Sequence, residues 1–324
     1  MGAFTPLLET FMRNRSLILA AVLGGLAAAA QAQSSSSLTI YGRIDMTVGK
    51  RLGTDNKALE PGTGNRLGVI GTEDLGGGLR AFFNMEHGFV GQDGSQTDAA
   101  RFWNRRSFVG IEGNFGRVFL GRDYTPAYLY AQLQGDPFGH TQAPAQLSID
   151  TGGIAKVRVD NTVNYATKLG AFGLAAQVGE SNGALVKSPD RPMALGLNYK
   201  SGPLYVGYGY DNPGGENDVW HFATANYKFG DLRVLGSFGT GKTDADAKRR
   251  SYQLGAEYQI GGGEIRFVHG ILKDKTGDRT LVQRTGLGYH YSLSKRTTVY
   301  VNLAHDSKLA NEKSAYDLGL YHAF

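Results

Sequence analysis

The sequence predicts an all-β protein, a transmembrane antiparallel β-barrel of about sixteen strands. Three observations lead to this fold class. Apolar and polar residues alternate along segments of roughly ten residues, about twice the usual length of a soluble strand. Short and longer connections follow one another in turn between these segments. The chain also has 47 glycines, 17 tyrosines and 16 phenylalanines, a composition that suits many strands joined by tight turns.

Residues 1–32 are expected to be a secretory signal peptide that is removed on export. Arg13 and Arg15 precede the apolar residues 17–30, and an Ala-Gln-Ala cleavage site follows them. Translation could also start at Met12. The mature barrel domain is therefore predicted to cover residues 33–324.

Charge and hydropathy exclude several protein classes. The whole chain carries +5, and loss of two arginines and one glutamate with the signal leaves +4, without a charge block suited to nucleic acid. There are no cysteines, which decides little about the compartment. After the signal no apolar run reaches 18 residues, so no transmembrane helix is predicted. Strands of alternating character remain able to cross a membrane.

The first and last predicted strands show the pattern most clearly. Along residues 38–48 one face is apolar and the other polar. Along residues 314–324 the residues sharing one face are Tyr316, Leu318, Leu320, His322 and Phe324. The aromatic Phe324 suits a membrane interface. A terminal strand of a soluble sandwich would alternate in the same way, and it is the signal peptide that favours the barrel.

The connections between strands fall into two kinds that alternate. The short ones are residues 74–78, 114–116, 170–173, 201–203, 229–231, 261–263 and 294–296. The longer polar ones include residues 51–64, 91–100, 183–192, 213–219, 243–250 and 309–313. Outer-membrane barrels have this asymmetry between periplasmic turns and external loops. The connection at 126–158 is much longer, and its aromatic residues predict that it packs against something.

Several segments resemble the general porins of Gram-negative bacteria, in the variety typical of β-proteobacteria. They are residues 37–45, 66–79, 104–116, 120–122 and 320–324. The resemblance implies an outer-membrane homotrimer of sixteen-stranded barrels, each with its third external loop, here 126–158, folded into the pore as a constriction. It implies passive diffusion of small hydrophilic solutes and ions. The expected partners are outer-membrane lipid and lipopolysaccharide, the barrel assembly machinery and periplasmic chaperones.

The resemblance also implies a basic pore wall that faces acidic groups of the inserted loop. The basic residues at matching positions are Arg43, Arg66, Arg105 and Arg158. Alternation independently places Arg43 inside, and it adds Arg80, on the face of Asn84 and Glu86, as a lumenal residue near the periplasmic mouth. The acidic candidates are Asp136, Asp150 and Asp123. With so few acids, the constriction should be net positive and prefer anions.

Two further predictions concern assembly. Arg122 shares the outward face of Leu120, and a lipid-facing arginine near the midplane costs about 2 to 4 kcal/mol, so protein should cover it. The family resemblance implies a latch from Asp93 or Asp98 of a neighbouring subunit. The alternative is that the strand ends before Arg122. The terminal Phe324 resembles the C-terminal assembly signal of outer-membrane barrels.

Other motifs are not expected to carry chemistry. Residues 236–243 match the phosphate-loop pattern G-x-x-x-x-G-K-[ST], but a polar loop follows instead of the helix that would bind phosphate. The seven histidines lack metal-ligand spacing, so neither metal nor cofactor is predicted. A catalytic triad is recognised by geometry, and no enzymatic activity is expected, an outer-membrane lipase being the enzyme alternative. The remaining alternatives are a channel selective for phosphate or other anionic solutes and a surface antigen with a closed pore.

Overall fold

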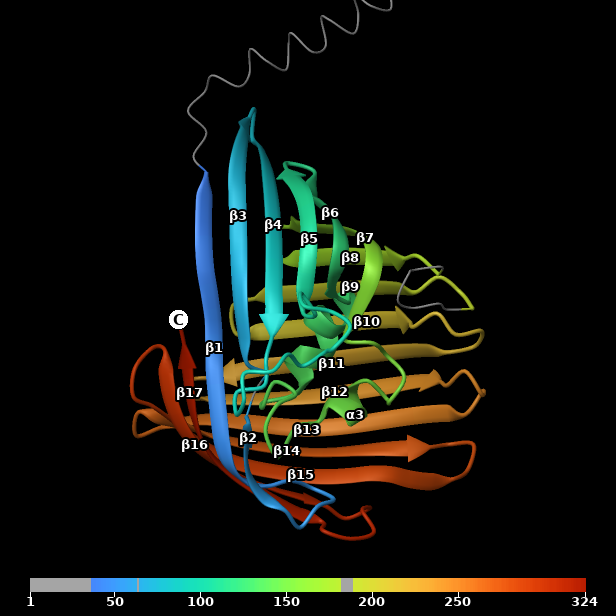
Figure 1. The fold of residues 1–324 in the computed structure, drawn as a ribbon. Helices are drawn as coiled ribbons and strands as arrows, with labels where there is room; N and C mark the ends of the chain where they lie inside the picture. Colours follow the sequence, from blue (N-terminus) through green and yellow to red (C-terminus); the bar gives the residue numbers. More distant parts are fainter. Residues whose placement is uncertain (1–35, 63, 182–188) are drawn as a thin grey trace, which may run out of the picture.

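The computed structural model describes residues 36–62, 64–181 and 189–324, which form one closed antiparallel β-barrel (Figure 1). The predicted signal peptide lies outside the described residues. The strands are β1 (Ser37–Lys50), β2 (Lys57–Pro61), β3 (Arg66–Gly76), β4 (Leu79–Gly88), β5 (Arg106–Gly113), β6 (Gly116–Tyr124), β7 (Arg158–Leu169), β8 (Phe172–Gly179), β9 (Met193–Ser201), β10 (Leu204–Asn212), β11 (Val219–Phe229), β12 (Leu232–Lys242), β13 (Lys248–Ile260), β14 (Gly263–Asp274), β15 (Arg279–Ser292), β16 (Thr297–Asp306) and β17 (Ser314–Ala323).

The described strands fill sixteen positions around the ring, because β2 and β3 share one position. The first half of β1 pairs with β3, from Ser37 opposite Thr72 to Arg43 opposite Arg66. The second half of β1 pairs instead with β2. On its other side β1 pairs with β17, which closes the ring. The predicted barrel is therefore confirmed, but the connection predicted at 51–64 is wrong in part, since residues 57–61 continue the ladder along the long β1.

Side chains alternate between lipid and lumen as the sequence indicated. In β16, Val301 and Leu303 point outward and are 45% and 54% exposed. Between and beside them, Asn302 and Tyr300 point inward and are buried. Polar residues buried inside and apolar residues exposed outside are the reverse of a soluble protein, and they suit a barrel surrounded by lipid.

Tight turns join the strands at one end of the barrel. The strand pairs β7–β8, β9–β10 and β11–β12 are separated by two residues each, and the first of each two is a glycine, Gly170, Gly202 and Gly230. All three have φ between 53° and 59°, a conformation that two-residue hairpins require and glycine adopts without a steric penalty. The seven short connections expected from the sequence all lie between consecutive strands of the structure.

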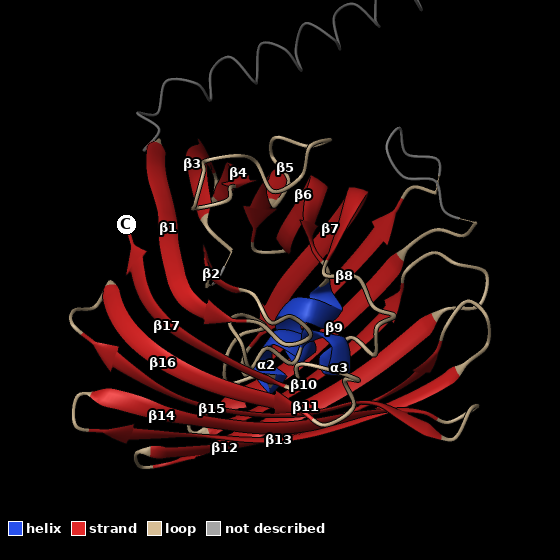
Figure 2. Ribbon diagram, turned by 60° about the horizontal axis from the view of Figure 1, so that its bottom comes forward, coloured by secondary structure: helices blue, strands red, loops and turns tan. Residues whose placement is uncertain are grey.

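The connection between β6 and β7, residues 125–157, is here called the inserted loop. It contains three short helical segments, η2 (Tyr128–Gln132), α2 (Leu133–Gly135) and α3 (Leu147–Asp150). Figure 2 shows these segments, in blue, within the ring of strands. No helix among the described residues has the length and apolar character needed to cross a membrane.

One side of the lumen is packed against the inserted loop. Ala131 and Ile149 of the loop form an apolar cluster with the inward-facing Trp220, Phe222 and Leu272. Inward-facing glycines let the two backbones approach closely. A Cβ atom at Gly207 would lie 2.1 Å from the carbonyl oxygen of Tyr130, and one at Gly209 would lie 2.8 Å from the Cα of Ala127. The absence of side chains at these wall positions therefore determines where the loop can lie.

Candidate functional site: an arginine-lined passage

A cavity of about 800 Å³ lies between the inserted loop and the other side of the barrel wall, and we call it the passage. Five arginines of the wall from β1 to β7, here called the arginine wall, line it. They are Arg43, Arg66, Arg105, Arg106 and Arg158. A sixth lining arginine, Arg266, comes from β14. The structure thus brings the four matched arginines of the sequence prediction to one surface.

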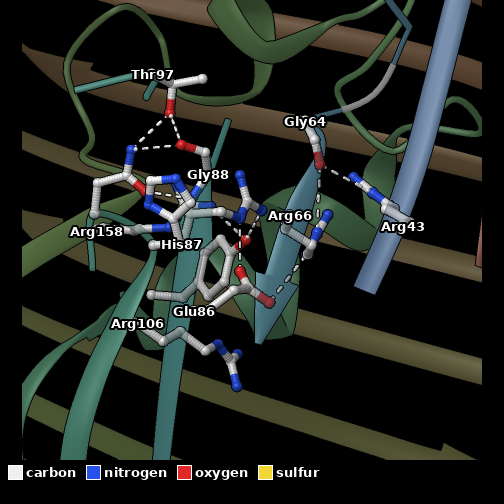
Figure 3. A network of polar contacts seen from close by, with 12 residues as sticks. Arg43, Gly64, Arg66, Glu86, His87, Gly88, Thr97, Arg106 and Arg158 are labelled. Atoms are coloured by element: carbon white, nitrogen blue, oxygen red, sulfur yellow. Dashed lines mark hydrogen bonds and ion pairs between the residues drawn. The ribbon is translucent and has the colours of Figure 1, made fainter. Parts of the chain in front are cut away.

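Arg43 and Arg66 are neighbours because they lie directly opposite each other on β1 and β3. Both donate from Nε to the carbonyl oxygen of Gly64, at 3.1 Å and 3.4 Å (Figure 3). Gly64 lies in the interruption between β2 and β3, where the chain leaves the ladder and its carbonyl is available. A local break in one strand therefore orients two positive side chains toward the passage.

Glu86 is the buried carboxylate of the arginine wall. It accepts a hydrogen bond from Arg105 Nε at 2.6 Å, and Arg66 Nη1 lies 3.6 Å away. The Tyr41 hydroxyl donates to its other oxygen at 2.9 Å. Alternation predicted that Glu86 faces the lumen, but not that its carboxylate pairs with the arginines of the wall. The alternation of β4 contained the signal, since Glu86 shares a face with Asn84.

Tyr124, at the end of β6, organises the rest of the wall. Its hydroxyl accepts hydrogen bonds from Arg105 Nη2, at 2.6 Å, and from Arg158 Nη2. The guanidinium carbons of Arg158 and Arg106 lie 4.0 Å and 4.9 Å from the centre of its ring. The ring in turn stacks on Tyr128 of the inserted loop, with centroids 5.3 Å apart. Cation–π contacts hold these arginines without neutralising their charge.

Arg106 and Arg266 were missed by the sequence analysis. Arg106 lies opposite Glu86 in the β4–β5 ladder, so it points inward, whereas Arg105 lies just before β5 begins. In β14, Ile265 and Phe267 form the outward face, which leaves Arg266 inside. Alternation alone could have identified both residues.

The three predicted acidic residues lie in different surroundings. Asp136 lines the passage, and its oxygens accept backbone N–H groups from Phe138, His140 and Gln146. Asp150 points into the loop instead, where its Oδ2 lies 2.7 Å from His140 Nε2. Burial raises the pKa of the Asp150 carboxyl to about 7, although the hydrogen bond to His140 acts in the opposite direction. Asp123 is buried behind the wall, 3.2 Å from Arg106 Nε.

Charges along the passage are unbalanced. Six arginines line it, against the two lining carboxylates of Asp136 and Glu264 and the buried carboxylates of Glu86 and Asp123, which pair with Arg105 and Arg106 behind the surface. Glu264 is held by Arg266, at 2.6 Å. Within the described part of the chain, neither Arg43 nor Arg158 forms an ion pair with a carboxylate, since their hydrogen bonds go to Gly64 and Tyr124. Fixed positive charge in a narrow passage with low-dielectric walls produces a focused positive potential.

Arg80 lies away from the passage. Its Nη2 is 2.5 Å from Glu112 Oε1, and its side chain is 59% exposed near the short turns. Glu112 is shared with Arg117, at 2.8 Å. Arg80 therefore does not contribute an unpaired charge to the passage.

Arg122 lies on the outer side of the barrel wall, within β6, so the alternative of an early strand end is wrong. It donates to Asp160 Oδ1 at 2.5 Å and to the carbonyl oxygen of Asn104 at 2.7 Å. Asp98 pairs with Arg101 at 2.7 Å, and this hydrogen bond holds the pKa of Asp98 below its usual range. Asp93 is exposed and accepts hydrogen bonds from Ser95.

Two sequence motifs are accounted for by the barrel. The phosphate-loop match at 236–243 lies along β12, which ends at Lys242, so no helix follows and no phosphate cradle forms there. Residues 179–183 spell G-x-S-x-G, the pattern of a hydrolase nucleophile. That nucleophile requires a turn from a strand to a helix, whereas Gly179 ends a strand of an antiparallel barrel and residues 182–188 fall outside the described residues.

Comparisons with known proteins agree with this architecture. A family model described as Gram-negative porin matches residues 19–311. Outer membrane porin protein 32 of Delftia acidovorans is 34% identical, over 95% of this chain and 92% of its own length. An outer membrane porin protein of Bordetella pertussis is 28% identical, over 96% of this chain and 100% of its own.

Solved structures give the same result. The anion-selective porin from Comamonas acidovorans superimposes with a TM-score of 0.77 at 28% identity, covering 90% of this chain and 100% of that one. The trimer form of OmpT from Vibrio cholerae gives a TM-score of 0.68 at 14% identity, covering 89% of this chain and 99% of that one. At that identity the second match shows the fold alone.

Proposed function

This chain belongs to the Gram-negative porin family, and we propose that its outer-membrane channel prefers anions, which it selects at the arginine wall. As a porin it forms a water-filled channel through which small hydrophilic solutes and ions diffuse passively across the outer membrane.

The observation that carries the anion preference is the excess of arginine over carboxylate along the passage. Arg43 and Arg158 present charge that no carboxylate in the described residues neutralises. One unit charge 4 Å from another contributes about 1 kcal/mol in water and about 4 kcal/mol near a protein surface. Anions should therefore be concentrated in the passage and cations depleted.

Size selection comes from the inserted loop, which we propose is the constriction. Its middle is anchored to several strands around the ring. The Tyr205 hydroxyl donates to the carbonyl oxygen of Tyr130 at 2.7 Å, and Ala143 N donates to Asp317 at 2.6 Å. A loop fixed at both sides narrows the lumen to the passage beside the arginine wall.

The similarity to the anion-selective porin from Comamonas acidovorans supports the preference. Acidic residues of the outer loops oppose it. Among them, Glu60 is paired with Arg51 and Asp246 with Lys242, which reduces their influence at the mouth.

The deciding experiment is the reversal potential of purified protein in a planar bilayer under a tenfold KCl gradient. Ohmic conductance steps with anion selectivity would support the proposal, and cation selectivity would overturn it. Conductance that saturates with millimolar phosphate would favour a channel selective for that solute class. Absence of conductance from folded protein would favour a surface protein with a closed pore.

We further propose a homotrimer, as in the trimer form of OmpT. Outward-facing Arg122 supports a subunit boundary there, because lipid contact would cost about 2 to 4 kcal/mol. Asp160 offsets part of that cost within the chain. Of the two predicted latch residues, Asp93 is the better candidate, because Asp98 would have to exchange its ion pair with Arg101. Light scattering of Asp93→Asn against Asp190→Asn, an exposed carboxylate of another loop, tests this contact.

Phe324 is proposed as an assembly signal that the barrel assembly machinery recognises. Its backbone exchanges two hydrogen bonds with Gly42, at 3.0 Å and 3.1 Å, so it also completes the ladder between the first and last strands. Contacts with lipopolysaccharide and periplasmic chaperones belong to the same proposal.

A further inference from the structure

Three potential metal ligands meet inside the inserted loop. Asp136, His140 and Asp150 each offer one ligand atom, and these atoms lie within 4.8 Å of one another. The side chains of His140 and Asp150 are 1% and 0% exposed, and Asp136 is 4% exposed. Asp136 precedes the bend formed by residues 139–146, His140 lies at its start and Asp150 ends α3 beyond it, so the cluster joins two parts of the loop.

Two atoms of the cluster are buried without a hydrogen-bond partner in the described part of the chain. They are His140 Nδ1 and Asp150 Oδ1, the second of which has the Gln253 side chain as a neighbour outside hydrogen-bond geometry. Leaving a buried polar atom unsatisfied costs about 1 to 3 kcal/mol, so native proteins rarely do so. An unpartnered imidazole nitrogen on a buried side chain, next to a fully buried carboxylate, is what a bound cation would use.

The charge of the cluster also indicates a cation site. Two carboxylates are buried within one small volume, and no lysine or arginine among the described residues pairs with either of them. The His140 imidazole lies 2.7 Å from Asp150, while the nearby Arg249 and Arg284 donate to backbone carbonyls of the loop instead. A bound metal takes its ligands in their deprotonated forms, so a neutral imidazole and two carboxylates would bring a charge of −2, which one divalent cation would balance.

We propose that Asp136, His140 and Asp150 form a binding site for one divalent cation of the zinc class within the inserted loop. One imidazole nitrogen with two carboxylate oxygens is a three-ligand set that zinc accepts, a water molecule completing its coordination. Calcium and magnesium prefer sets made of oxygen only, so the imidazole disfavours them.

The surroundings orient the ligands. Asp136 is fixed by backbone N–H groups of Phe138 and His140, both at 2.9 Å, and of Gln146 at 3.0 Å. The carbonyl oxygen of Asp150 accepts a hydrogen bond from Trp220 Nε1 at 2.7 Å, which anchors α3 to β11. Such supporting contacts typically change metal affinity by about 10- to 100-fold.

A bound cation would hold two parts of the inserted loop together at the constriction. It would connect the start and the end of the bend formed by residues 139–146, of which Gly139, His140, Thr141 and Gln142 line the passage. Cross-linking these positions would restrict the part of the loop that faces permeating solutes. The sequence predicted no metal, because a single histidine with distant aspartates lacks a recognised spacing.

The test uses untagged protein purified from outer membranes in detergent and stripped with EDTA. Zinc is titrated by calorimetry, and bound metal is counted by mass spectrometry after gel filtration. We expect one zinc per chain. Asp150→Asn and His140→Gln should each weaken binding by at least about tenfold, whereas the exposed-site controls Asp190→Asn and His322→Gln should leave it unchanged.

Correct folding of each variant is checked by its heat-modifiable mobility in gels. Because two ligand variants are made, the test remains decisive if one of them fails to fold. Absence of saturable binding by the wild type, or equal binding by the ligand variants, would overturn the proposal and leave a hydrogen-bonded His140–Asp150 pair. Reversal potentials measured with zinc and with EDTA separate this site from the proposed anion preference, because that preference depends on the arginine wall and should persist without metal.

Discussion

The two sides of the lumen differ in how their inward-facing residues are used. On β9 to β14 they include glycines and apolar residues that pack against the inserted loop, as at Gly207, Gly209 and Trp220. On β1 to β7 they are arginines that remain beside open space, as at Arg43 and Arg158. The packed side fixes the position of the loop, and the charged side determines what the remaining space attracts.

If the passage selects ions as proposed, its selectivity depends on both walls. If the loop lay against the arginines, burial would require a partner for each charge. Because the glycines of the opposite wall accept the loop backbone, the arginines keep contact with the passage. Variants of the two sides should therefore have separable effects. Changes on the packed side should alter pore size, and changes on the charged side should alter ion preference.

Removing the largest buried anchor should have the largest effect. In Trp220→Ala the loss of a fully buried ring and of its hydrogen bond to Asp150 should cost about 3 to 5 kcal/mol. We expect larger, noisier single-channel conductance and faster proteolysis within residues 125–157. Trp103→Ala, which removes a half-buried ring that packs against Phe102 outside the inserted loop, is the control. Unchanged conductance would contradict the anchoring role of the packed side.

A smaller effect is expected where a methyl group is added. In Gly207→Ala the new Cβ would lie 2.1 Å from the carbonyl oxygen of Tyr130, so the loop must shift at a cost of about 1 to 3 kcal/mol. Conductance should change while the anion preference keeps its sign. Gly236→Ala, whose nearest neighbour would be 3.5 Å away, should behave like the wild type. Equal conductance in the two variants would rule out the close approach as a determinant.

Removing charge from the arginine wall should alter the ion preference of the channel more than the size of the pore. Each of Arg43→Ala and Arg158→Ala should remove about 1 kcal/mol of attraction for an anion, about a fivefold change in the ratio of anion to cation permeability. The reversal potential of the double variant should move toward or past zero. Arg80→Ala, paired with Glu112 away from the passage, serves as the control. A double variant as selective as the wild type would refute the arginine wall as the filter.

Ionic strength should give the smallest change. The Debye length falls from about 30 Å at 0.01 M to about 3 Å at 1 M salt, so ions screen exposed charges strongly at high concentration. We expect the anion preference to decline as KCl rises at a constant concentration ratio. A preference independent of salt would indicate binding in the desolvated interior instead.

The sequence predicted the fold well because lipid imposes a strict alternation on every strand. The start of β16 after the turn at 294–296, the tight turn at Gly230 and the long connection before Arg158 all follow from local patterns. Local patterns did not predict that β2 and β3 share one position in the ring, because this arrangement depends on β1 being longer than its neighbour.

The site was less predictable because its pairs are distant in sequence. Alternation places Glu86 inside, but only the folded barrel brings Arg105 to it from the far end of a loop. Asp150 was expected to face the arginines, yet it points to His140 because the loop bends between them. The partner of Arg122, Asp160, lies on the next strand beyond the whole inserted loop.

The seam between β1 and β17 has a consequence for how the molecule folds. Arg43 lies opposite Ala323, so this ladder joins the two strands that are most distant in sequence. Pairings of such high contact order form slowly, because the chain entropy between them is lost before their hydrogen bonds are gained. Until the seam forms, two long strands expose unpaired edges that can add to another chain. Ring closure should thus be the late step of folding, during which aggregation competes with insertion.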